Sequence, residues 1–128
     1  MSTRSQFLKE FRGDALGIIN FETSSDEYFQ NQILRPILKL QNDLYIELFK
    51  NYILKSKANF ETFTIDKKCQ FIEISIQKDT KFRNLLIGIV IGLFSIDEYL
   101  LYVKNTSSLN KRIIAMLIER FKNQLQLL

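Results

Sequence analysis

Apolar residues return every third or fourth position along most of this 128-residue chain, and few residues interrupt them. The chain holds one Pro and four Gly, so the residues that usually mark turns are scarce. A period of three to four residues indicates an α-helix with one apolar face, whereas a strand alternates every second residue. We therefore predict an all-α fold, a single domain over residues 1–128 built as an irregular bundle of five to seven helices.

The composition argues against several kinds of chemistry. The chain has no His, which is the commonest metal ligand and the usual general base near neutral pH. Cys69 is the only Cys, so the chain cannot form an internal disulfide or a Cys-rich zinc site. No carboxylate pair or other catalytic constellation is recognisable. We therefore lean towards a non-enzymatic protein without a metal or a cofactor.

The longest apolar run, residues 85–94, is too short for a membrane span. Ten residues of helix rise about 15 Å, which is half of a ~30 Å hydrocarbon core. The first residues also lack the apolar stretch of a secretory signal. We expect a cytoplasmic protein that does not enter a membrane.

The net charge is +4, and the two signs are interspersed until residue 104. Basic residues then dominate, with Glu119 opposing Lys104, Lys111, Arg112, Arg120 and Lys122. A few separated cations are more typical of a solvated helix face than of a nucleic-acid footprint. We do not expect a nucleic-acid partner.

The apolar periodicity and the capping residues together predict the individual helices. We expect them over residues 3–12, 26–56, 65–77, 80–94, 96–104 and 108–126. Pro36 should kink or break the second near residues 32–35. Residues 14–23 fit an extended strap or a short helix. Residues 37–56, 80–94 and 108–126 should form the core, with 80–94 apolar all round and most buried.

Helix starts are predicted from residues that cap free backbone N–H groups. The candidates are Ser24 or Ser25, Thr64, Asp79 or Thr80, and Ser95, which forms a capping box with Glu98.

A row of small residues, Asn84, Gly88 and Gly92, recurs at every fourth position of the 80–94 helix. Each Gly inside a helix costs about 0.5–1 kcal/mol relative to Ala, so a compensating contact is expected. One interpretation is a tight crossing of two helices within the domain. The other is a groove that receives a partner helix or a small ligand.

Cations gather at the start of the same helix, where free N–H groups favour anions. Lys81 and Arg83 would bind a phosphate or a carboxylate there; alternatively, Asp79 caps the helix and pairs with Arg83. Arg35 lies in the apolar stretch ILRPIL. It is either an anion anchor or an outward side chain beside Asn31 and Lys39.

The chain resembles small all-helical bacterial proteins of unsettled activity that often carry a glyoxalase label. Three segments carry the resemblance, NQILRPILKLQNDL, KFRNLLIGIVIGLFSIDEYL and SSLNKRIIAMLIERFKNQLQL, and it covers nearly the whole chain. It implies a lyase of glyoxalase type. Glyoxalases of the βαβββ class hold a metal with His, Glu or Gln on a curved sheet. A helical chain without His gives no metal-binding residue to carry over.

Three functions follow from these observations. The first is a non-catalytic interaction module that forms a homo-oligomer, such as a homodimer, or docks a protein partner, because 46% of the residues are hydrophobic. The second is a module that binds a small anionic ligand, and the third is the lyase of the family label. The candidate residues for a ligand or partner groove are Lys81, Arg83, Asn84, Gly88, Gly92 and Arg35.

Overall fold

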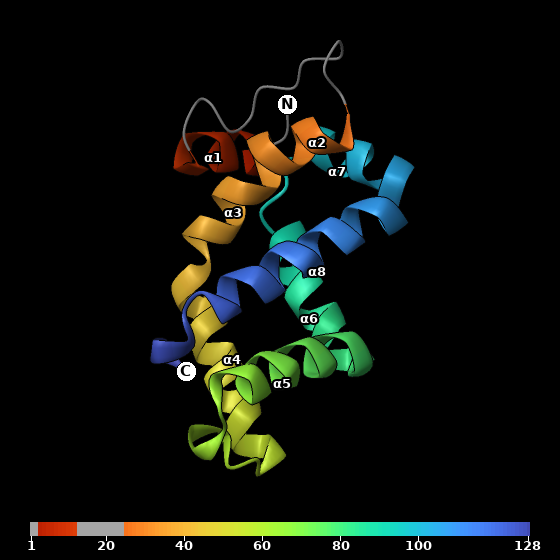
Figure 1. Ribbon diagram of the computed structural model, residues 1–128. Helices are drawn as coiled ribbons and strands as arrows, with labels where there is room; N and C mark the ends of the chain where they lie inside the picture. Colours follow the sequence, from red (N-terminus) through yellow and green to blue (C-terminus); the bar gives the residue numbers. More distant parts are fainter. Residues whose placement is uncertain (1–2, 13–24) are drawn as a thin grey trace.

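The computed structural model describes residues 3–12 and 25–128, and every regular element in them is helical (Figure 1). The α-helices are α1 (Thr3–Arg12), α2 (Asp26–Phe29), α3 (Arg35–Leu40), α4 (Asn42–Ser56), α5 (Ile65–Lys78), α6 (Thr80–Ile91), α7 (Ile96–Tyr102) and α8 (Thr106–Lys122). A π-helical turn, η3 (Gln30–Leu34), joins α2 to α3 without a break. Three 3-10 turns are η4 (Phe60–Thr62), η5 (Val103–Asn105) and η6 (Leu125–Leu127).

The predicted all-α bundle of five to seven helices is confirmed, because α2, η3 and α3 run on as one helix. The two alternatives for residues 14–23 lie outside the described residues. None of the described helices combines the length and the apolar character needed to cross a lipid bilayer.

The helix starts follow the local signals in the sequence. The hydroxyl of Ser25 accepts a hydrogen bond from the backbone N–H of Tyr28 at 3.1 Å, and Thr64 caps α5 in the same way. Asp79 caps α6, and Ser95 with Glu98 forms the predicted capping box at α7. The stretch FIEISI, which also alternates like a strand, lies within α5.

Pro36 changes the helix without ending it. Its ring clashes with the preceding turn and it offers no N–H group, and the turn before it widens into the π-helix η3. The helix then continues to Leu40. A second interruption, at Gln41, was not predicted and separates α3 from α4, so residues 37–56 form two helices.

The core is centred on the ring of Phe49 in α4, which is fully buried. It contacts the rings of Phe71 in α5, Phe82 in α6 and Phe121 in α8, at centroid distances of 4.8–6.2 Å. Aromatic rings bury much apolar area and favour tilted or edge-on contacts. This cluster therefore holds four helices together.

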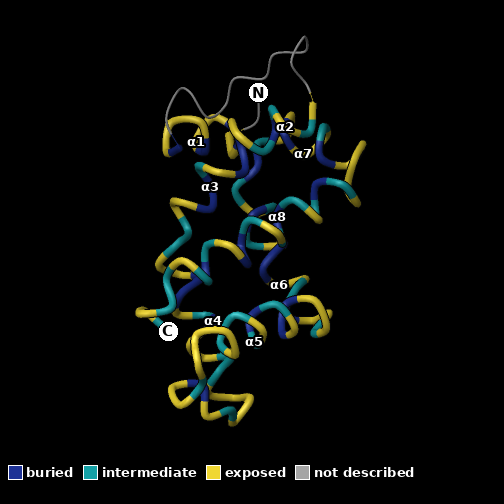
Figure 2. The backbone as a smooth tube through the Cα atoms, viewed as in Figure 1, coloured by how far each residue is buried: buried dark blue, intermediate teal, exposed yellow. Residues whose placement is uncertain are grey.

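The prediction for residues 80–94 needs two corrections. The helix α6 ends at Ile91, and it is not buried all round, because one side of it is exposed (Figure 2) and carries Leu85 and Gly88. Phe82, Leu86 and Val90 are buried, and their spacing forms a single inward face. Phe94, beyond the helix, is also buried.

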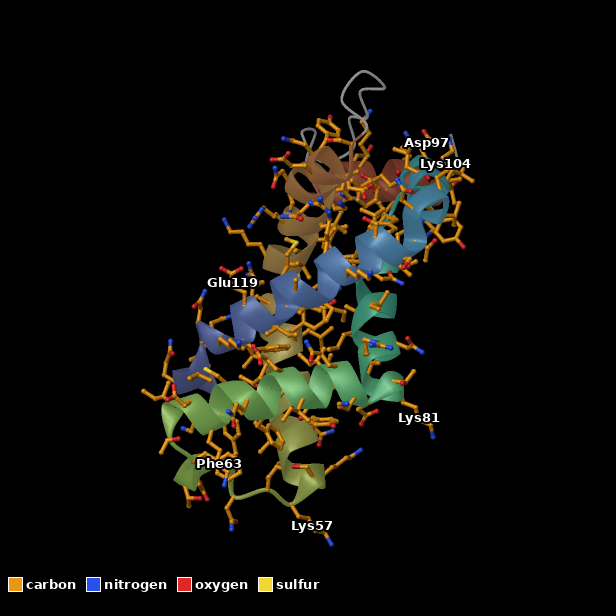
Figure 3. The ribbon with its side chains drawn as sticks, turned by 45° about the vertical axis from the view of Figure 1, so that its right-hand side comes forward. Lys57, Phe63, Lys81, Asp97, Lys104 and Glu119 are labelled. Atoms are coloured by element: carbon orange, nitrogen blue, oxygen red, sulfur yellow. The ribbon has the colours of Figure 1, made fainter. Side chains whose placement is uncertain are left out.

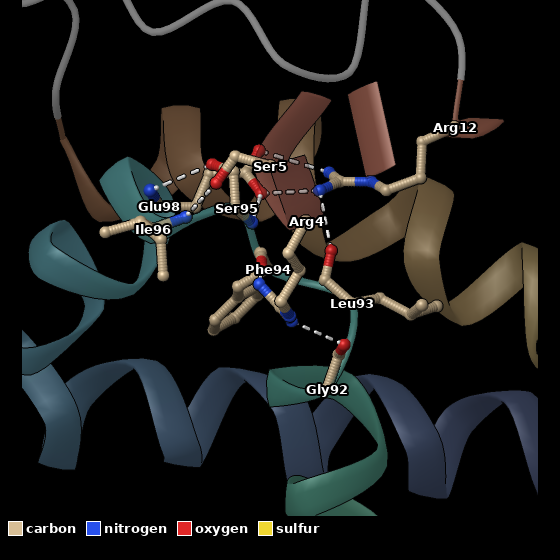
Figure 4. Close-up of polar contacts among 9 residues, drawn as sticks. All are labelled: Arg4, Ser5, Arg12, Gly92, Leu93, Phe94, Ser95, Ile96 and Glu98. Carbon is tan, nitrogen blue, oxygen red and sulfur yellow. Dashed lines mark hydrogen bonds and ion pairs between the residues drawn. The ribbon is translucent and has the colours of Figure 1, made fainter. Parts of the chain in front are cut away.

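The end of α6 is bound by two arginines from α1 (Figure 4). Arg4 donates to the backbone oxygens of Gly92 and Phe94 at 2.8 and 2.6 Å, and Arg12 donates to that of Leu93 at 2.8 Å. Carbonyls at a helix C-terminus lack helical partners and carry partial negative charge. Cationic donors from a distant segment therefore satisfy three consecutive carbonyls there.

Arg12 also forms a buried ion pair with Glu98, which lies in the first turn of α7 (Figure 4). Their side chains are 2% and 0% exposed, and the guanidinium bonds both carboxylate oxygens, at 2.5 and 3.2 Å. Glu98 Oε1 further accepts from the backbone N–H of Ser95 at 2.8 Å, and Ser5 accepts from that of Ile96. These contacts fix α1 across the α6–α7 turn.

We predict that Arg12→Met lowers stability by about 3–5 kcal/mol, because it leaves the Glu98 carboxylate buried without its cation. Residues 3–12 should then detach, since an isolated helix of this length is marginal in water. Urea unfolding and amide exchange across residues 3–12 measure both effects. The double variant Arg12→Met/Glu98→Met leaves no buried charge and should lose much less. If the double variant loses as much stability as the sum of the losses from Arg12→Met and Glu98→Met, the two residues do not interact as described.

Tyr45 links α4 to α6 through a buried hydrogen bond. Its hydroxyl donates to the backbone oxygen of Leu86 at 2.7 Å, and burial raises the pKa of Tyr45 well above its usual range. The folded state therefore keeps a proton that the unfolded chain begins to lose near pH 10. Stability from this group is fully present below that pH and falls as the pH rises above it.

We predict that wild type loses stability more steeply than Tyr45→Phe above about pH 10, by up to about 1.4 kcal/mol per pH unit. At neutral pH the variant should lose about 1 kcal/mol with the hydrogen bond. Urea unfolding at a series of alkaline pH values gives the comparison. Parallel curves for the two proteins would show that Tyr45 does not titrate as described.

Candidate functional site

A groove of about 480 Å³ opens between α6 and α8, where α5 ends. Its lining residues are Gln77, Arg83, Asn84, Ile87, Ser107, Asn110, Lys111, Ile114, Ala115 and Ile118. Two are cationic, none is a carboxylate, and the rest divide between hydrogen-bonding and apolar side chains. Small-molecule sites are commonly about 300–1,000 Å³ and combine apolar walls with a few polar groups.

The helical period of α8 builds one wall of the groove. Residues four apart lie on one face of a helix, and two such rows face the groove. The rows are Ser107, Lys111 and Ala115, and Asn110, Ile114 and Ile118. Both begin with polar residues and end with apolar ones. The wall therefore offers a polar end and an apolar end to one ligand.

The polar end carries donors without acid partners. Arg83 makes one hydrogen bond within the described part of the chain, a long one of 3.4 Å to the backbone oxygen of Gln77. No described carboxylate lies within ion-pair distance of Arg83 or Lys111. Both cations are therefore free to bind an anion.

Asn110 is oriented by its neighbour Tyr102. The Tyr102 hydroxyl donates to Asn110 Oδ1 at 2.6 Å, and burial raises the pKa of Tyr102, which keeps that proton in place. Because the amide oxygen is occupied as an acceptor, the remaining capacity of Asn110 includes its two N–H donors. The amide therefore adds donors beside Arg83 and Lys111.

The structure brings together two of the six residues singled out from the sequence, Arg83 and Asn84. Lys81 lies one helical face away and extends outward from the start of α6 (Figure 3). Arg35 is exposed on α3 and donates to Asn31 Oδ1 at 3.0 Å, so it takes the outward orientation.

The proposed pairing of Asp79 with Arg83 does not occur. The two carboxylate oxygens of Asp79 accept from the backbone N–H of Phe82 and from the Tyr52 hydroxyl, each at 3.1 Å. The hydrogen bond from Tyr52, a residue of α4, holds the capping residue Asp79 against that helix. It also leaves Arg83 available to the groove.

The row of small residues, Asn84, Gly88 and Gly92, does not lie at a crossing of two helices. A Cβ atom built on Gly88 meets no atom within 4 Å, and on Gly92 it meets only backbone oxygens at 3.5 Å. Neither Gly lines the groove. Gly92 instead contributes its carbonyl to Arg4. The spacing predicted a close approach, but this face of α6 is exposed to solvent.

The basic residues near the C-terminus do not form one patch. Arg112 donates to Gln30 in η3, Arg120 to Asn42 in α4, and Lys122 pairs with Glu73 in α5. Lys111 is the one that reaches the groove. Cys69 is half-buried in α5, and no three described His, Cys, Asp or Glu side chains gather to hold a metal ion.

Comparisons of the chain with models of protein families, with curated proteins and with solved structures gave no match.

We predict that Gly88→Ala raises stability by about 0.5–1 kcal/mol, because the added methyl group meets open space and Ala favours the helix. Chemical unfolding measures the change. Ala115→Gly, at an exposed position inside α8, is the mirror control and should lower stability by a similar amount. If Gly88→Ala lowers stability instead, the added methyl group does not meet open space, and the description of this face of α6 is wrong.

Proposed function

We propose that the protein is a non-catalytic binding module that holds a small organic anion in the α6–α8 groove. The observation that carries the proposal is the pairing of two cations, Arg83 and Lys111, in one lining that contains no carboxylate. A guanidinium presents parallel N–H donors that match a carboxylate or a phosphate. Asn110 and Ser107 would complete the polar end.

The apolar part of the lining defines the rest of the ligand. Ile87, Ile114 and Ile118 offer aliphatic contact beside the cations. A free inorganic ion would leave these side chains uncovered, whereas a phosphate or carboxylate attached to a short apolar body would cover them. Burial of apolar area contributes roughly 25 cal/mol per Å². We therefore expect an amphiphilic anion to bind more tightly than a bare one.

Calorimetric titration with phenyl phosphate tests the proposal, with inorganic phosphate and phenol as the two partial ligands. Phenyl phosphate should bind more tightly than either. Arg83→Gln and Lys111→Gln should each weaken it roughly tenfold, as expected for loss of one charge-assisted hydrogen bond. Lys39→Gln removes an exposed charge on α3 and should leave the affinity for phenyl phosphate unchanged.

Two results would contradict the proposal. One is an affinity for phenyl phosphate that Arg83→Gln and Lys111→Gln leave unchanged. The other is equal binding of phenol and phenyl phosphate, which would show an apolar pocket that does not select charge. Affinity should also fall with added salt, because exposed charges are screened.

A further inference from the structure

The helix α7 has its rotation fixed by buried contacts on one side. Glu98 is buried against Arg12, and Tyr102 is buried against the ring of Phe94 at 5.5 Å while its hydroxyl bonds Asn110. These residues are four apart and therefore share a face. The opposite face of α7 must point outward.

That outward face is apolar. Ile96, Tyr99 and Leu100 of α7 and Val103, the first residue of η5, follow the spacing 0, 3, 4 and 7, and each is between 43% and 52% exposed. We call these four residues the α7 face. A spacing of this kind forms one continuous stripe along a helix. Contiguous exposed apolar side chains on a polar-rimmed helix commonly mark an interaction surface.

The charges beside the α7 face indicate what covers it. Asp97 in α7 and Lys104 in η5, which continues the helix, are exposed and lie seven residues apart; this spacing places them on one edge of the stripe, roughly 10 Å apart along the axis. Neither forms an ion pair among the described residues. Both lie at the end of the molecule away from Lys57 (Figure 3).

The charges on this edge are complementary to those of a second copy of the helix that runs in the opposite direction. If two copies of α7 pack antiparallel about a two-fold axis, Asp97 of each copy faces Lys104 of the other. An interface between identical surfaces requires this reciprocity. A partner of uniform charge would instead match one of the two residues and be repelled by the other.

We propose that the α7 face joins two copies of this chain in an antiparallel homodimer, with two Asp97–Lys104 pairs beside an apolar stripe. The face shares no residue with the α6–α8 groove, so the two proposals stand or fall separately. Stable interfaces cover about 800 Å² on each partner. Four half-exposed side chains suggest a dimer that dissociates on dilution.

Sedimentation of the full chain over a wide concentration range tests the dimer. Wild type should pass from monomer to dimer as concentration rises. Leu100→Ser should abolish the dimer, whereas Leu54→Ser, on an exposed residue of α4, should leave it intact. A wild type that stays monomeric at millimolar concentration, or a dimer that survives Leu100→Ser, would overturn the proposal.

Charge reversal tests the antiparallel arrangement. Asp97→Lys and Lys104→Asp should each weaken the dimer roughly tenfold or more, because like charges then face each other. Mixing the two single variants should restore association, since Lys at both positions of one chain meets Asp at both positions of the other. The double variant Asp97→Lys/Lys104→Asp should dimerise like wild type. If mixing restores nothing while wild type dimerises, the helices do not pair in this way.

Discussion

The buried ring of Phe49 makes the aromatic contacts that position α5, α6 and α8 against α4. It lies against Phe71, Phe82 and Phe121, so α5, α6 and α8 are each positioned relative to α4 by one side chain. The contacts of Phe49 with Phe82 and Phe121 position α6 and α8, and the groove opens between these two helices. None of the four rings lines the groove.

Local signals predicted most of the fold because caps act within one helical turn. Thr64, Asp79 and Ser95 begin helices where their side chains reach a nearby N–H group. The end of α6 was misplaced for the opposite reason. It depends on Arg4 and Arg12, which lie more than eighty residues earlier in the chain. No pattern within residues 80–94 contains that information, and the same holds for the pairing of Arg12 with Glu98.

The candidate site was half predictable on the same grounds. Arg83 was found because cations near a helix start favour anions, and Asn84 because it begins the row of small residues; both arguments are local. Lys111 and Asn110 were missed because they join the site only through the packing of α8. Leu109, Ile113 and Leu117 form the buried apolar row of α8, whereas the groove uses the neighbouring face of that helix. The helix crossing predicted at Gly88 and Gly92 is absent, because the same glycine spacing can occur on a packed face and on a solvated one.

We propose that a ligand binds in the α6–α8 groove, separate from the α7 face. Chemical-shift mapping on isotope-labelled protein titrated with phenyl phosphate tests this most directly. The account predicts changes concentrated at the start of α6 and the first half of α8, led by Arg83, Asn110 and Lys111. Changes confined to α7, or scattered over exposed lysines such as Lys39 and Lys57, would contradict it.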